Sequence, residues 1–100
     1  MPHVVTVFRS RLREPHEGYE QTADDMEDAA RAMPGFVDFK TFRAEDGERV
    51  SIVVFDSPEA HTAWRDDPQH RVAQQRGREE WYAEYHIQVC SLEYEHSFRH

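Results

Sequence analysis

Aromatic and imidazole side chains gather in one stretch of the chain, between residues 61 and 85. They are His61, Trp64, His70, Trp81, Tyr82 and Tyr85. Trp64 follows His61 by three residues, so the two share one face of a helix. Aromatic rings can line a cleft for a flat molecule, and His70 can add a proton-transfer group near neutral pH. The stretch therefore predicts a site for a small aromatic molecule. Core packing of both tryptophans, with His70 on the surface, is the competing interpretation.

None of the stronger reaction motifs accompanies this stretch. The chain contains no Gly-rich phosphate loop, no CxxC, no HExxH and no paired-carboxylate signature. Its seven histidines do not have the spacing of a metal site. Cys90 is the single cysteine and lies within an expected strand, where we expect it to be buried and inert.

Segments with strand or helix periodicity must position these side chains. Alternating and β-branched runs predict strands at residues 4–12, 36–43, 49–56 and 85–98. Apolar residues spaced four and three apart predict a helix over residues 17–33. Ser57-Pro58 and Asp67-Pro68 each predict a helix start, and the second segment reaches Tyr82. Within it, Gly77 indicates a bend or a close approach.

The element order is βαββαβ, which predicts an α+β, ferredoxin-like fold with the helices on one face of an antiparallel sheet. We expect one domain over residues 1–100. The strands at 4–12 and 49–56 are apolar on both faces: Val5 and Val7 alternate with Val4 and Phe8 in the first. Exposed apolar area costs about 25 cal/mol per Å², so we expect two copies to pack sheet to sheet as a homodimer. The alternative is a monomer with a few exposed valines.

Composition narrows the class of partner. The formal charge of −8 argues against nucleic acid, which requires a basic surface. No apolar run approaches the roughly 20 residues that span a bilayer, so we expect no membrane association. The first residues already resemble a strand and show no signal-peptide pattern. With a single cysteine, this favours a cytoplasmic protein.

Four segments together carry a resemblance that covers almost the whole chain. They are VVTVFRSRL at 4–12, MPGFVDFKTF at 33–42, EDGERVSIVVFDSPEAHTAW at 45–64 and HRVAQQRGREEWYAEYHIQVC at 70–90. With them the chain resembles the antibiotic biosynthesis monooxygenase family of dimeric α/β barrels. The MPGF turn, and the strand that precedes a tryptophan-bearing helix, are the most telling marks.

The resemblance implies a ferredoxin-like dimer with a pocket between the helices and the sheet of each subunit. It implies a monooxygenase that oxidises quinols or anthrones with molecular oxygen and uses no flavin, haem or metal cofactor. On this view Trp64 packs against the substrate, and His70 or Tyr82 accepts or positions a proton. Arg9 would stabilise the substrate anion if its side chain faces the pocket. His61, Trp81 and Tyr85 complete the expected substrate-binding set.

Two other functions remain open at this point. A second branch of the same family binds and degrades haem through a tryptophan, a histidine ten residues later and an asparagine in the first strand. Trp64 matches that pattern, but Gln74 stands at the tenth position and the chain contains no asparagine. The other alternative is a non-enzymatic, ligand-binding dimer on the same fold. Tight binding of a quinone without oxygen uptake would favour it.

Overall fold

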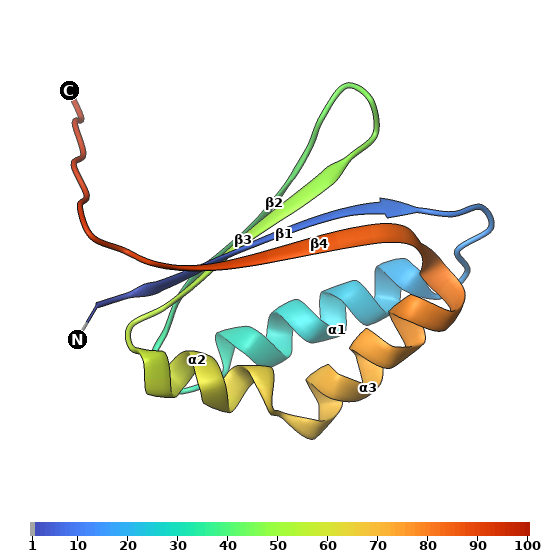
Figure 1. Ribbon diagram of the computed structural model, residues 1–100, viewed down its shortest axis with the longest axis horizontal. Helices are drawn as coiled ribbons and strands as arrows, with labels where there is room; N and C mark the ends of the chain where they lie inside the picture. The colour runs from blue at the N-terminus through green and yellow to red at the C-terminus, as the bar shows by residue number, and fades with distance from the viewer. Residues whose placement is uncertain (1) are drawn as a thin grey trace.

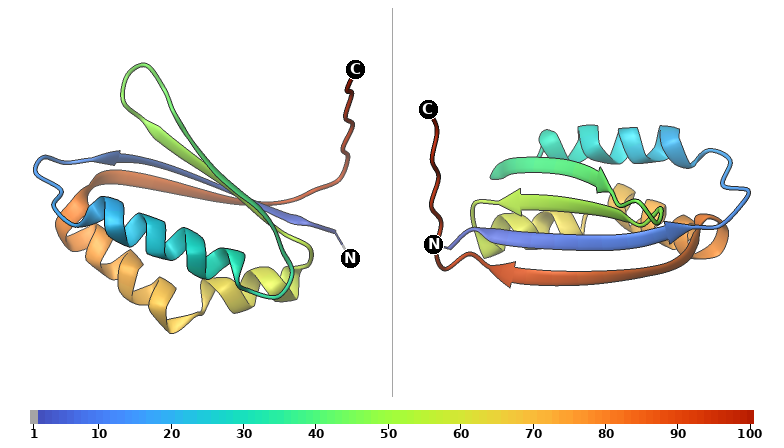
Figure 2. Two further views of the ribbon diagram at one scale, coloured as in Figure 1. Left: turned by 180° about the vertical axis from the view of Figure 1, so that it is seen from behind. Right: turned by 90° about the horizontal axis from the view of Figure 1, so that it is seen from above.

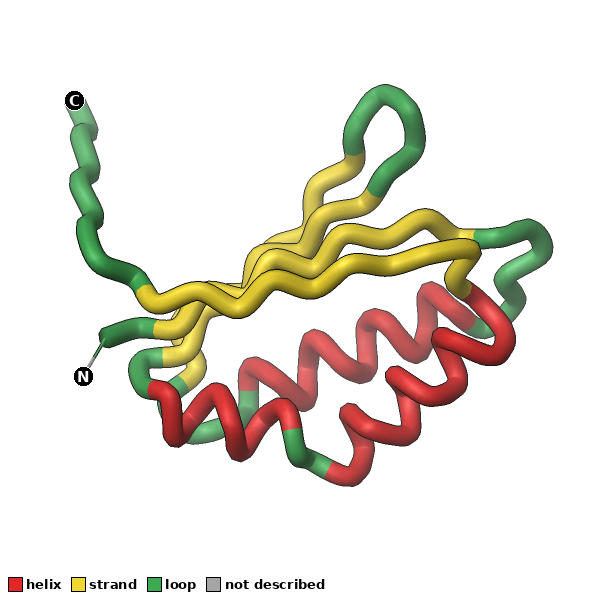
Figure 3. Tube along the Cα trace, viewed as in Figure 1, coloured by secondary structure: helices red, strands yellow, loops and turns green. Residues whose placement is uncertain are grey.

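A four-stranded antiparallel sheet with helices on one face makes up the protein in a computed structural model that describes residues 2–100 (Figures 1 and 3). The strands are β1 (Val4–Leu12), β2 (Phe36–Arg43), β3 (Arg49–Phe55) and β4 (Tyr82–Ser91), in the order β2-β3-β1-β4. The helices are α1 (Tyr19–Arg31), α2 (Pro58–Arg65) and α3 (Pro68–Arg76), and a π-helical turn at Gly77–Trp81 follows α3. The predicted ferredoxin-like fold is confirmed.

Side-chain caps set the starts of α2 and α3. The Ser57 hydroxyl accepts a hydrogen bond from the Ala60 N–H at 3.1 Å. The Asp67 carboxylate accepts one from the His70 N–H at 3.2 Å. A proline at the first helical position follows each cap, where its missing N–H costs nothing. Both predicted helix starts are therefore confirmed, and the second cap fixes the backbone of His70.

The first helix is shorter than the predicted range of residues 17–33. Gly18 has a φ of 83°, which is left-handed, so α1 begins only after it. At the other end Pro34 disfavours helical backbone at Met33, and α1 ends at Arg31.

The last strand differs most from its prediction at residues 85–98. It begins earlier, at Tyr82, because the π-helical turn has already brought the chain back beside Leu12. It ends earlier, at Ser91, because Ser91 pairs with Val4, the first residue of β1. One more backbone bond, from Leu92 N–H to the His3 carbonyl at 2.8 Å, follows. The remaining residues extend away on the side of the sheet opposite the helices (Figure 1).

The two faces of the sheet have different environments. The helices cover one face, as the view from behind in Figure 2 shows. The buried apolar residues on that side are Val4, Tyr19, Ala30, Val53, Phe55 and Trp81. On the other face Val5 lies beside Val54, and Val7 beside Ile52; all four are half-buried. The apolar alternation on both faces of β1 and β3 is thus confirmed.

Cys90 lies on the face without helices, where it pairs with Val5. Its side chain is exposed. The expectation of a buried cysteine is therefore wrong for the single chain, because β4 is an edge strand and no element of this chain covers that face.

Candidate functional site

A cavity of about 530 Å³ lies between the helices and the covered face of the sheet. Alternate residues of a strand point to the same face of a sheet. The floor of the cavity is therefore formed by Thr6 and Phe8 of β1, which face the helices, together with Ser51 and Val53 of β3. The three helices and β4 supply the walls. The lining includes six of the predicted site residues, which are His61, Trp64, His70, Trp81, Tyr82 and Tyr85.

One end of the cavity is a stack of rings around Trp64. Phe55 stacks on Trp64 with ring centroids 5.2 Å apart. His70 stacks on the indole as well, at 4.6 Å and with 30° between the ring planes. His61, one helical turn before Trp64, lies at an angle to the indole with ring centroids 6.0 Å apart, and it is only 7% exposed. The arrangement gives a flat molecule an aromatic wall with imidazole groups beside it.

His70 is placed to accept a proton. Its Nδ1 lies 3.4 Å from the Arg65 carbonyl oxygen. A carbonyl can only accept, so this contact requires the proton on Nδ1 and leaves the lone pair of a neutral ring on Nε2. Burial lowers the pKa of His70 below its ordinary value of 6.5, an effect that the Arg65 carbonyl and Asp67 partly oppose. The ring is therefore neutral at pH 7 and can act as a base.

A second group of rings closes the other end of the cavity. Tyr82 contacts Phe8 and Tyr85 with centroids 5.6 Å apart, and Tyr19 at 5.9 Å. Trp81 is 3% exposed, and its Nε1–H donates to the Glu17 carbonyl at 2.9 Å. Burial raises the pKa of the Tyr82 phenol above its ordinary value of 10. The Tyr82 phenol therefore keeps its proton at neutral pH and is able to donate a hydrogen bond, whereas the neutral ring of His70 has a lone pair on Nε2.

The π-helical turn positions this second group. Gly77 begins the turn, and a Cβ atom on it would lie 2.5 Å from Cε2 of Tyr82. Such a distance is shorter than any ordinary carbon–carbon contact, so the Tyr82 ring needs the glycine. The close approach that Gly77 suggested in the sequence is confirmed.

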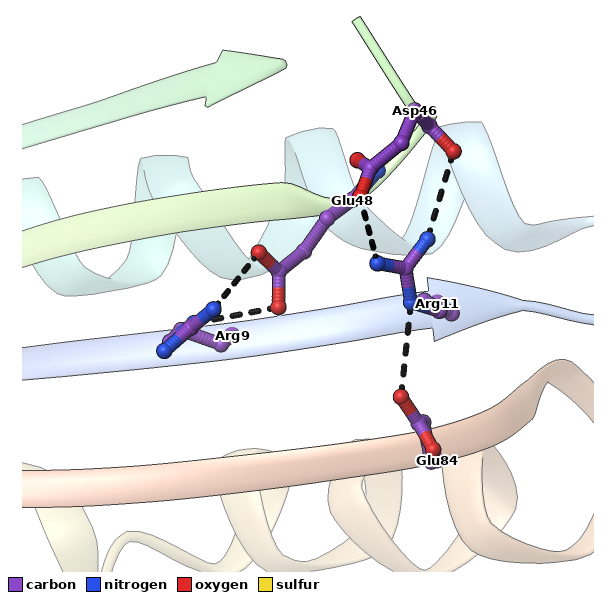
Figure 4. A network of polar contacts seen from close by, with 5 residues as sticks. All are labelled: Arg9, Arg11, Asp46, Glu48 and Glu84. Carbon is purple, nitrogen blue, oxygen red and sulfur yellow. Dashed lines mark hydrogen bonds and ion pairs between the residues drawn. The ribbon is translucent and has the colours of Figure 1, made fainter. Parts of the chain in front are cut away.

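The structure does not bring Arg9 to the cavity. Its parity places it on the opposite face of the sheet, where Nε and Nη2 donate to the Glu48 carboxylate at 3.0 and 2.9 Å (Figure 4). The neighbouring Arg11 pairs with Asp46 and Glu84 on that same face. Arg9 was expected to stabilise a substrate anion only if its side chain faces the pocket. Within one subunit its side chain does not face the pocket.

A different arginine reaches the cavity. Arg49, the first residue of β3, lines it, and its side chain is only 15% exposed. Sequence reasoning missed this residue, although strand parity could have found it: Arg49 shares a face with Ser51, Val53 and Phe55. Thr6, which is 4% exposed and also lines the cavity, was missed in the same way.

The cavity does not reproduce the haem-degrading pattern. Gln74 lines the cavity at the tenth position after Trp64, where the haem-degrading pattern requires an imidazole. An amide is a weak ligand for iron compared with imidazole. Within residues 2–100, no group of three His, Cys, Asp or Glu side chains is arranged to hold a metal ion. Over the same residues, no helix is long and apolar enough to cross a membrane.

Comparison with known proteins gives the site its family context. A family model described as antibiotic biosynthesis monooxygenase matches residues 2–76. The chain belongs to the antibiotic biosynthesis monooxygenase family. As a family member it is 31% identical over 98 residues to the uncharacterised protein YqjZ of Bacillus subtilis (strain 168). That match covers 98% of this chain and 86% of YqjZ.

Solved structures support the same family fold. Rv0793 from Mycobacterium tuberculosis superposes with a TM-score of 0.83 at 21% identity, over 95% of this chain and 99% of that one. SnoaB from Streptomyces nogalater, a cofactor-independent oxygenase, superposes with a TM-score of 0.79 at 16% identity, over 95% and 97% of the two chains. At these identities the likeness concerns the fold. The family model ends at Arg76, so it does not cover Trp81, Tyr82 and Tyr85.

Proposed function

We propose that this protein is a cofactor-independent monooxygenase that oxidises a small aromatic quinol or anthrone with molecular oxygen. The observation that carries the proposal is the Trp64–His70 stack inside the cavity, with rings 4.6 Å apart and His70 protonated on Nδ1 by its contact with a carbonyl. Family membership and the likeness to SnoaB support it.

The proposed reaction balances without an external reductant. With an anthrone as example, His70 Nε2 accepts a proton from the acidic carbon, and the resulting anion transfers an electron to O₂. The substrate radical and the superoxide then combine to form a C–O bond, and the oxygen atom that takes up the returned proton carries it as a hydroperoxide. When the O–O bond breaks, the oxygen atom on carbon becomes the new carbonyl of the quinone. The other leaves as water with the two hydrogen atoms that the carbon loses. The protein's part is to orient the substrate against Trp64, to exclude water and to accept the proton.

Tyr82 has a supporting role in this proposal. Its phenol stays protonated because burial raises its pKa. It can therefore donate a hydrogen bond to the oxygen on which the negative charge of the substrate anion develops. His61, Trp81 and Tyr85 shape the cavity around the substrate.

We also propose that the protein works as a homodimer in the cytoplasm. Val5, Val7, Ile52 and Val54 form an apolar patch on the face of the sheet without helices. Arg9–Glu48 and Arg11–Asp46 ion pairs lie on the same face, a polar border that is typical of an interface (Figure 4). Packing two such faces together would remove the patch from water. The cytoplasmic location rests on the single cysteine.

The test is oxygen consumption by the purified protein, stripped of metal with a chelator, against a panel of anthrones and quinols. Uptake above the autoxidation rate, lost in Trp64→Ala, supports the proposal. His96→Gln in the exposed tail is a control that should retain activity. Tight binding of a quinone with no uptake for any quinol would instead favour the non-enzymatic, ligand-binding function.

A further inference from the structure

The cavity extends along β3 well beyond the Trp64 stack. Phe55, the last residue of β3, stacks on Trp64, and Arg49, the first residue, lines the cavity as well. Six strand residues at about 3.3 Å each place the two Cα atoms roughly 20 Å apart. Both side chains face the helices because their positions differ by an even number. The cavity therefore has a charged end that the proposed oxidation does not use.

The Arg49 guanidinium is incompletely paired. Its Nη1 lies 3.8 Å from Oε1 of Glu20, which is beyond hydrogen-bond distance, and the Glu20 side chain is 65% exposed. Its Cζ lies 5.3 Å from the centre of the Tyr19 ring. Its Nε is buried and has no hydrogen-bond partner. A buried donor without an acceptor is costly, and the protein's own groups leave this guanidinium incompletely satisfied.

A second unpaired group belongs to another residue of the same cavity lining. Across residues 2–100, the buried side-chain polar atoms without a hydrogen-bond partner are Arg49 Nε and Thr6 Oγ1. Both residues line the cavity. The Thr41 and Ser51 hydroxyls, which also line it, bond to each other at 2.7 Å. Among the described residues, both unsatisfied buried side-chain atoms thus belong to residues of the cavity lining.

We propose that Arg49 forms an anion-binding subsite, and that the ligand of this cavity is an aromatic compound carrying a carboxylate. A planar guanidinium matches a carboxylate with two parallel hydrogen bonds. One arginine beside a glutamate suits a single negative charge better than the two charges of a phosphate. The aromatic walls at Tyr19, Tyr82 and Trp64 suit the rest of the molecule. This inference rests on the proposed function, because it names a group on that substrate.

The experiment measures binding by isothermal titration calorimetry, with anthraquinone-2-carboxylate and its neutral amide as matched probes. The carboxylate should bind the wild-type protein roughly tenfold or more tightly than the amide, since hydrogen bonds to charged groups are worth that much. Arg49→Gln should remove this preference, so that the carboxylate and the amide bind with similar affinity. Arg43→Gln makes the same charge change at the position paired with Arg49 on β2, outside the cavity lining, and should keep the preference.

A further variant tests whether the positive charge of Arg49 attracts the carboxylate, and it leaves Arg49 itself in place. Glu20→Gln removes the carboxylate that competes for the guanidinium, so it should strengthen carboxylate binding a few-fold and leave amide binding unchanged. A purely structural role of Arg49 predicts no such gain.

Each outcome separates this inference from the proposed function. Equal affinity of the wild-type protein for the two probes, or a carboxylate preference that survives Arg49→Gln, overturns the subsite and leaves the aromatic cavity standing. Failure of both probes to bind overturns the subsite and the aromatic cavity together. If Arg49→Gln does not fold, the gain in carboxylate affinity expected for Glu20→Gln still tests the assignment to Arg49, and the absence of that gain overturns it.

Discussion

Replacing Gly77 with alanine should destabilise the protein, although alanine is the better helix former. Gly77 has ordinary helical angles, φ −58° and ψ −46°, so the backbone accepts alanine. The gain in helix propensity is about 1 kcal/mol. The new Cβ, however, would lie 2.5 Å from Cε2 and 2.8 Å from Cδ2 of Tyr82.

The Tyr82 ring cannot move away cheaply. It packs edge-on against Phe8 at 5.6 Å and against Tyr19 at 5.9 Å. Overpacking of this kind costs about 1–3 kcal/mol. Against the propensity gain, we expect a net loss of about 1 kcal/mol in the free energy of unfolding. For a domain of this size that lowers Tm by roughly 4–8 °C.

A double-mutant cycle isolates the cause. In a Tyr82→Val background the ring is gone, so Gly77→Ala should become stabilising by up to about 1 kcal/mol. Urea unfolding at one fixed protein concentration measures all four proteins. A Gly77→Ala variant that is as stable as the wild type, or a change of the same sign in both backgrounds, would refute the packing argument.

Other consequences of the structure are open to direct test. Val7→Asp should dissociate the dimer in analytical ultracentrifugation, whereas Val72→Asp, on a residue of α3 that is 69% exposed, should not; a dimer that survives Val7→Asp contradicts the proposed interface. Ser57→Ala removes the cap of α2 and should cost about 1 kcal/mol, with Ser97→Ala in the exposed tail as the neutral control. Because burial lowers the pKa of His70 below 6.5, the unfolded chain binds this proton more tightly. Stability should therefore be fully present above pH 6.5 and fall as the pH drops from there toward the folded pKa. His70→Gln should make that fall shallower, and an unchanged pH profile would show that His70 is not buried as a neutral ring.

Most of the fold follows from local sequence signals. β1 and β2 have their predicted bounds, and the Ser57 and Asp67 caps begin helices where the sequence indicates them. These signals depend on neighbours in the chain. The end of β4 could not be found in this way, because it depends on where the partner strand β1 begins, at Val4. The same holds for Cys90, whose exposure depends on its place at the sheet edge.

The candidate site was predicted unevenly for a related reason. His61, Trp64 and His70 are close in sequence, on two short helices, and the structure brings them together. Arg9 and Arg49 are single residues in strands, where a shift of one position changes the face. The face of the sheet on which each lies distinguishes them. Arg9 lies on the face opposite the cavity residues Thr6 and Phe8, whereas Arg49 lies on the same face as these two residues.

The central claim is that His70 accepts the substrate proton in an oxidation that needs no cofactor. The direct measurement is the rate of oxygen uptake with an anthrone by chelator-treated wild-type protein and by His70→Gln. We expect catalysed uptake by the wild type and a rate lower by about a hundredfold or more in the variant, with its fold intact by circular dichroism. Uptake by His70→Gln at the wild-type rate would contradict the account.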